Sequence, residues 1–278
     1  MTPSALMIHL TPGQSNEKLL QLGADLAERL KVSQVVGIAG CQPVQVYGEG
    51  SFYVSGDILD LDRAEIDKEL GEAEAAFRAA FVGKPARLEW RSTVDYRLIA
   101  DYIANEMRAA DLLLTMPEQE VSVLDTSRRV LVADLVLRTG RPILVANPEV
   151  SKLDLDNVVV GWKESREARR ALHDALPLLA LAGRVTVLEI AAEEDMPEAR
   201  RRVGDVVSWL MGHDIAASGR TTVSRGNDAA ELAAQAEELK AGLLVGGAYG
   251  HNRLRELVLG GVTRDLLLKP ARCSFISH

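Results

Sequence analysis

Apolar runs and amphipathic segments alternate along this chain, and the same order occurs twice. The runs that predict strands lie at 5–10, 34–39, 87–91, 111–116 and 142–146, and again at 158–160, 184–190, 217–223, 243–247 and 273–276. The segments between them have apolar residues near helical spacing, as Leu19, Leu22 and Leu26 show in the first one. Alternating strands and helices of this kind predict parallel sheets with helices on both faces.

The repeated order indicates an internal duplication. The two halves also end alike, with LVLRTGRPILVA in the first and DLLLKPARCSFIS in the second, and Asn147-Pro148-Glu149 is typical of a linker. We therefore predict an α/β protein of two tandem Rossmann-like domains, at 1–150 and 151–278, each a five-stranded parallel sheet flanked by helices. Each fifth strand would leave an edge of unpaired backbone groups, so we expect the two to pair antiparallel within the chain.

Composition excludes several classes of protein. The chain has 278 residues, 47% of them hydrophobic, which is enough for two globular cores. Its net charge of −8 argues against a general nucleic-acid binder and against docking on an anionic membrane. Cys41 and Cys273 lack metal-ligand spacing, as do the histidines, and suit reduced thiols. With no signal peptide or membrane span in the sequence, we expect a cytoplasmic protein.

The glycine-rich stretch 241–269 is the strongest candidate for a binding site. Its apolar run 243–245 ends in Gly246-Gly247, and a second glycine pair, Gly260-Gly261, precedes a helical pattern. Glycine lets a backbone approach a ligand closely, and a helix start offers unpaired N–H groups, so together they can hold a phosphate. The alternative is a pair of tight turns that only connect elements.

The spacing of this stretch, Gly247-x2-Gly250-x9-Gly260, resembles the nucleotide loop of the universal stress protein family. The resemblance extends over essentially the whole chain and implies tandem domains of the adenine nucleotide alpha hydrolase-like type. It also implies an ATP site, with magnesium. The positions that it assigns to the phosphates are Gly247, Gly250, Gly260, Gly261, Val262 and Thr263. This chain has Gly261 where a serine or threonine is usual in the family.

The same resemblance places the adenosine near the end of the first strand of the second half. Gly161, Trp162 and Lys163 occupy the turn where the family usually has an aspartate, here replaced by Lys163. Lysine cannot accept the aspartate's hydrogen bonds, but its charge can reach a phosphate; it can equally be a solvent-facing cation. The resemblance assigns a backbone contact with adenine to Ile190, which also suits an ordinary strand-end core residue.

The first half has none of the loop glycines, and its corresponding segment, MPEQE, would repel phosphates. We interpret it as a degenerate copy and expect at most one ATP per chain. No P-loop, nucleophile elbow or zinc-helix motif occurs, so an enzyme is not expected. The family resemblance implies a stress-response regulator, and the alternatives are a nucleotide-free interaction module with a vestigial pocket or a slow ATPase. A further homodimer stays open, and the protein partner is unknown.

Overall fold

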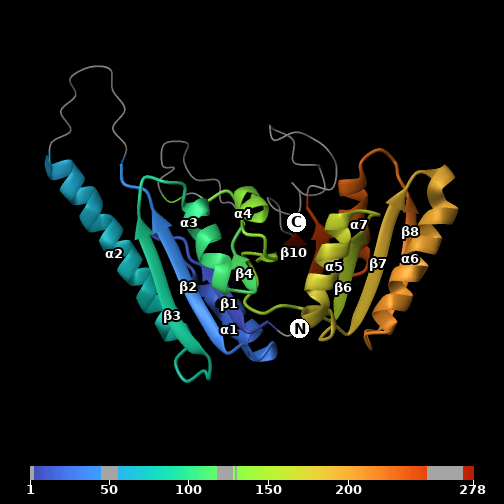
Figure 1. The fold of residues 1–278 in the computed structure, drawn as a ribbon, viewed down its shortest axis with the longest axis horizontal. Coiled ribbons are helices and arrows are strands. Elements are labelled where there is room, and N and C mark those ends of the chain that lie inside the picture. The colour runs from blue at the N-terminus through green and yellow to red at the C-terminus, as the bar shows by residue number, and fades with distance from the viewer. Residues whose placement is uncertain (1–2, 45–55, 118–127, 129, 249–271) are drawn as a thin grey trace, which may run out of the picture.

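The computed structural model describes residues 3–44, 56–117, 128, 130–248 and 272–278. The strands of the first half are β1 (Ala5–His9), β2 (Gln34–Cys41), β3 (Arg87–Val94), β4 (Leu112–Thr115) and β5 (Ile143–Val145). Those of the second half are β6 (Asn157–Trp162), β7 (Arg184–Ala191), β8 (Ala217–Val223), β9 (Leu243–Gly247) and β10 (Cys273–Ser277). They form one ten-stranded sheet in the order β3-β2-β1-β4-β5-β10-β9-β6-β7-β8 (Figure 1).

Helices cover both faces of this sheet. The described helices are α1 (Glu17–Arg29), α2 (Gly56–Ala80), α3 (Ile99–Glu106), α4 (Val132–Arg138), α5 (Arg166–Leu179), α6 (Met196–Met211) and α7 (Asp228–Glu238). Side chains from α1, α2, α5 and α6 share one buried cluster, and those from α3, α4 and α7 share another. Successive strand residues point to opposite faces, so Leu6 and Ile8 of β1 join the first cluster while Met7 joins the second.

The two halves meet at the centre of the sheet, where β10 lies antiparallel to β5, the arrangement expected of the two fifth strands. The register pairs Ser274 with Val145 and Phe275 with Leu144, whereas the other strand pairs are parallel. In Figure 1 the sheet opens as a V, with β3 at the end of one arm and β8 at the end of the other. The first cluster contains residues of both halves, including the linker residue Leu155, so the halves share a core.

The predicted α/β fold is therefore confirmed, but some predicted boundaries shift. The sequence also predicts a helix at 128–139, ahead of Gly140, but α4 begins only at Val132, because Leu131 is extended, with φ −71 and ψ 116. Arg128 instead donates a hydrogen bond of 2.6 Å to Glu69 of α2. The helix predicted from Val262 lies outside the described residues. Of the helices in the described ranges, none combines the length and the hydropathy that crossing a bilayer requires.

Candidate functional site

Each half of the sheet has a topological switch point, where the chain leaves two neighbouring strands in opposite directions. These points lie at the carboxyl ends of β1 and β4 and of β6 and β9, the places where α/β sheets bind ligands. In the register, Ile8 pairs with Leu114, and Val160 pairs with Val245. One position further along, the first half has His9 and Thr115, and the second half has Gly161 paired with Gly246.

The switch point of the first half is filled by its own side chains. His9 Nδ1 and Thr115 Oγ1 lie 2.9 Å apart and form a hydrogen bond, and both residues are buried. Burial lowers the pKa of His9 from 6.5 to about 4, so the imidazole is neutral at physiological pH. A buried hydrogen-bonded pair stands where a ligand would have to enter.

Acidification should destabilise the protein through His9. Its pKa is near 6.5 in the unfolded chain and about 4 in the fold, so the unfolded state takes up a proton first as pH falls. The stability due to neutral His9 is therefore complete above pH 6.5 and is lost as pH falls towards 4. Between pH 7 and pH 5 we expect a loss of about 2 kcal/mol from this group.

Urea unfolding of wild type and of His9→Gln at both pH values measures this loss. The stability difference between them should change by that amount, because the variant lacks the titrating group. His173→Gln is the matched control, since His173 is exposed, and it should follow wild type at both pH values. If the free energies of unfolding of wild type and of His9→Gln change by the same amount between the two pH values, His9 is not the group responsible for the loss.

The switch point of the second half is lined by glycines instead. A Cβ added to Gly161 would lie 3.4 Å from the nearest side-chain atom, Cδ2 of Leu232 on α7, which is ordinary contact distance. Ile190 of β7 is partly buried against the same cluster as Leu232. Gly161, Gly246 and Ile190 therefore lie near one end of the sheet, with Gly161 and Ile190 on the α7 side.

Lys163 and the start of α5 border this glycine pair. Lys163 is exposed, and Ser165 caps the helix by accepting a hydrogen bond of 3.1 Å from the Ala168 N–H. Glu167 in the first turn is buried, yet its pKa is lowered. Desolvation raises the pKa, but hydrogen bonds from its own N–H, Arg166 and Ser165, together with the charge of Arg166, outweigh it. The first turn of α5 thus already holds a carboxylate.

Gly247 contacts this turn directly. A Cβ at Gly247 would lie 2.5 Å from the carbonyl carbon of Glu167 and 2.6 Å from the Ala168 nitrogen. The close approach of α5 to β9 therefore requires glycine here without any ligand. The other predicted loop positions, Gly250, Gly260, Gly261, Val262 and Thr263, lie outside the described residues.

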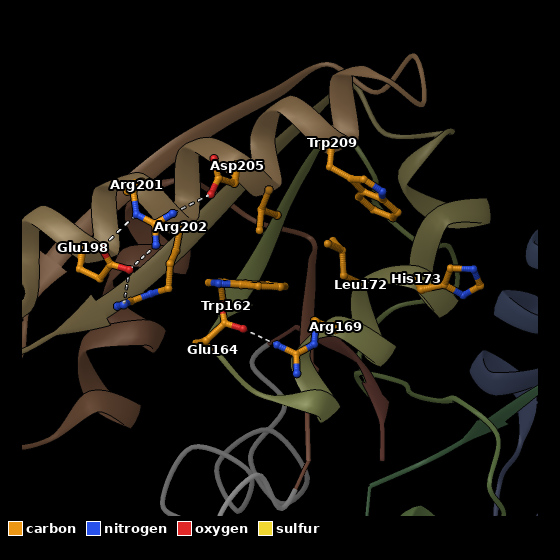
Figure 2. Close-up of a pocket in the computed structure, with 11 residues that line it drawn as sticks. Trp162, Glu164, Arg169, Leu172, His173, Glu198, Arg201, Arg202, Asp205 and Trp209 are labelled. Carbon is orange, nitrogen blue, oxygen red and sulfur yellow. Dashed lines mark hydrogen bonds and ion pairs between the residues drawn. The ribbon is translucent and has the colours of Figure 1, made fainter.

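Trp162 points to the opposite face of the sheet from Gly161. It follows Gly161 in β6, so its side chain lies on the opposite face of the sheet, in the cluster shared by α5 and α6. There it lines a cavity between those two helices (Figure 2). Trp162 and Gly161, which the resemblance assigns to one site, therefore face different layers of helices.

A buried ion pair beside this cavity was not predicted. Arg202 Nε on α6 donates to Glu189 Oε1 at 3.1 Å and to Oε2 at 3.3 Å, and only 4% of the Glu189 side chain is exposed. The only sequence signal is a glutamate in the apolar run VTVLEIA. Among the described residues, no group of histidine, cysteine, aspartate and glutamate side chains could hold a metal ion.

Comparison with known proteins gives similarity at the level of structure. No model of a known protein family matches the sequence, and no curated protein matches it. A universal stress protein from Archaeoglobus fulgidus DSM 4304 is 14% identical and has a TM-score of 0.74, covering 100% of this chain and 96% of its own. A functionally unknown protein from Pseudomonas aeruginosa PAO1 is 13% identical, with a TM-score of 0.62 and coverages of 99% and 92%.

A shorter match is a universal stress protein from Archaeoglobus fulgidus in complex with dAMP. It is 16% identical, covers 51% of this chain and 97% of its own, and has a TM-score of 0.32. That score is too low to say anything about a ligand of this chain. The full-length matches show the fold, and the ligand has to be argued from the residues.

Proposed function

We propose that this chain, which has the fold of a two-domain universal stress protein, is a cytoplasmic stress-response regulator that binds one adenine nucleotide, ATP with magnesium, in its second half. The proposed domains are 1–150 and 151–278. The first binds no nucleotide and contributes five strands to the shared sheet, and the second holds the ligand. No catalytic role is proposed.

The difference between the two switch points carries this proposal. Equivalent positions have His9 and Thr115 in one half, and Gly161 and Gly246 in the other. The first pair fills its place with a hydrogen bond of 2.9 Å between buried side chains. The second pair has no side chains, and glycine is the residue that lets a backbone approach a ligand closely. One ligand per chain follows from this asymmetry.

The described residues suit the two ends of a nucleotide. Ile190 lies near the carboxyl end of β7, on the face of the sheet that α7 covers, where its backbone could contact a base. Lys163 is exposed at the same end of the sheet, and its ammonium group can reach phosphate oxygens. The family resemblance assigns the remaining phosphate contacts to Gly250, Gly260, Gly261, Val262 and Thr263. The magnesium ion would be bound by the phosphate oxygens of ATP and would enter the site together with the nucleotide.

Calorimetric titration with ATP and magnesium tests the proposal. We expect saturable binding with one site per chain. Gly161→Ala should weaken it about tenfold, because overpacking of 1–3 kcal/mol at the site corresponds to roughly that factor. The fold should persist, since the nearest atom to the new Cβ is 3.4 Å away. Gly204→Ala is the matched control, because a Cβ at Gly204 meets nothing within 4 Å, and it should bind like wild type.

A nucleotide-free interaction module is the second candidate, and two observations favour it. Gly247 is explained by its contact with α5, and Glu167 places a carboxylate in the first turn of that helix. Wild type that fails to bind at millimolar ATP would support this candidate and overturn the first. Two sites per chain would contradict both. Phosphate release during the titration would instead indicate the slow ATPase.

A further inference from the structure

The cavity between α5 and α6 has the size of a small-molecule site. Its volume is about 720 Å³, within the range of ligand pockets. Its apolar lining comes from Trp162, Leu172, Val206 and Trp209. Figure 2 shows Trp162 in the gap between the helices, with Leu172 and Trp209 extending from the two sides. The apolar part of a ligand would lose its contact with water here, which favours binding.

The charged side chains around this cavity sum to one negative charge. Three arginines stand among four carboxylates, counting Glu189, the partner of Arg202, and taking histidine as neutral. The ion pairs are Arg169–Glu164, Arg201–Glu198, Arg201–Asp205 and Arg202–Glu189. The first and the last of these pair one arginine with one carboxylate. The surplus negative charge therefore belongs to the two carboxylates that share Arg201.

The surplus carboxylate is Asp205 on α6. Arg202 donates to both oxygens of Glu189, at 3.1 and 3.3 Å, and lies 3.9 Å from Glu198. Arg201 Nε donates a hydrogen bond of 3.0 Å to Glu198, whereas its Nη1 lies 3.5 Å from the Asp205 carboxylate. With 71% of its side chain exposed and only this long contact, Asp205 can accept a hydrogen bond from a ligand.

The indole rings add to the attraction for a cation. The face of an indole ring attracts ammonium groups, and both Trp162 and Trp209 line the cavity. Trp209 follows Asp205 by four positions on α6, so the two side chains are neighbours on the helix surface. Trp209 is 40% exposed and is accessible to a ligand. A cationic group at this edge of the cavity would meet both a carboxylate and an aromatic ring.

We propose that the α5–α6 cavity is a second ligand site, for an amphipathic amine whose apolar body occupies the cavity and whose ammonium group pairs with Asp205 beside Trp209. This site is separate from the nucleotide site proposed above. Gly161 faces α7, and the next residue, Trp162, faces α5 and α6. The proposal therefore stands whether or not ATP binds.

Three indole compounds that differ in one terminal group test it. Tryptamine ends in an ammonium group, tryptophol in a hydroxyl group and indole-3-propionate in a carboxylate. The indole region of a ¹H–¹⁵N spectrum of the labelled protein reports on binding directly, because the chain has three tryptophans. At pH 8 we expect tryptamine to shift the signals of Trp162 and Trp209 along one saturable curve and to leave Trp90, in the first half, in place.

Affinity should follow the charge of the terminal group. Tryptamine should bind about five- to tenfold tighter than tryptophol, the combined worth of an exposed ion pair and a cation–π contact, and indole-3-propionate should bind most weakly. Asp205→Asn should lower the affinity for tryptamine about threefold and leave that for tryptophol unchanged. Asp67→Asn is the matched control, because Asp67 is an exposed aspartate of α2 in the other half, and both affinities should stay as in wild type.

Equal affinity of wild type for tryptamine and tryptophol, or tightest binding of indole-3-propionate, would overturn the proposal. So would Trp162 and Trp209 signals that stay in place up to millimolar tryptamine, or a preference for tryptamine that is undiminished in Asp205→Asn. The wild-type results do not depend on a variant that folds.

Discussion

Replacing Arg202 with methionine is expected to lower the free energy of unfolding by about 3–5 kcal/mol. The substitution keeps much of the apolar stem but leaves the Glu189 carboxylate, with 4% of its side chain exposed, without its bidentate partner. An unpaired buried charge is among the few single changes that cost this much. Denaturant unfolding of the whole chain, with the transition followed by circular dichroism, measures the change.

Two further variants test whether the loss of stability comes from breaking the Glu189–Arg202 ion pair and not from removing any arginine of α6. Arg201→Met removes a neighbouring arginine of α6 with 63% of its side chain exposed, and we expect a change within about 0.5 kcal/mol. The double variant Glu189→Leu/Arg202→Met should recover most of the lost stability, because an apolar pair can replace a buried ion pair at little cost. If Arg202→Met is as mild as Arg201→Met, Glu189 does not depend on Arg202.

Gly247→Ala is expected to destabilise the protein by about 3 kcal/mol, at the upper end of the usual cost of overpacking. The new Cβ would lie 2.5 Å from the Glu167 carbonyl carbon and 2.6 Å from the Ala168 nitrogen. Both atoms belong to helix backbone, so relief requires α5 to move away from β9. The thermal unfolding midpoint should fall together with the free energy.

Gly204→Ala is again the matched control, and it should raise the free energy of unfolding where Gly247→Ala lowers it. Gly204 lies within α6 with nothing within 4 Å of an added Cβ, so alanine should stabilise by about 0.5–1 kcal/mol. Gly247→Ala that unfolds like wild type would show that α5 and β9 are not in this close contact. Its ATP affinity can be interpreted only after this stability measurement.

The order of elements could be predicted because strand and helix patterns are local. Buried runs such as 243–245 and amphipathic segments such as 16–30 each indicate their own structure. The position of Arg128 could not be predicted, because it donates a hydrogen bond to Glu69, which is 59 positions away. Patterns within one segment contain no information about such a contact.

The candidate site could be predicted less well, for two physical reasons. The sequence VVVGW of β6 is apolar on both faces, as in parallel sheets covered on both sides, so no alternation shows which way Trp162 points. His9 and Thr115 lie 106 positions apart, and only the register of β1 with β4 brings them together. The family resemblance named Gly161 and Gly247, but the requirement for glycine at Gly247 lies in the backbone of α5.

The antiparallel pairing of β5 with β10 has a consequence for how this molecule can change over generations. In an assembly of two identical chains, every substitution appears twice, so a residue that closes one site closes both. Here the equivalent assembly is made within one polypeptide, so each half accumulates its own substitutions. One switch point therefore has His9 and Thr115, whereas the equivalent positions of the other have Gly161 and Gly246. Covalent linkage allows the two halves to differ at equivalent positions, which two copies of one chain cannot do.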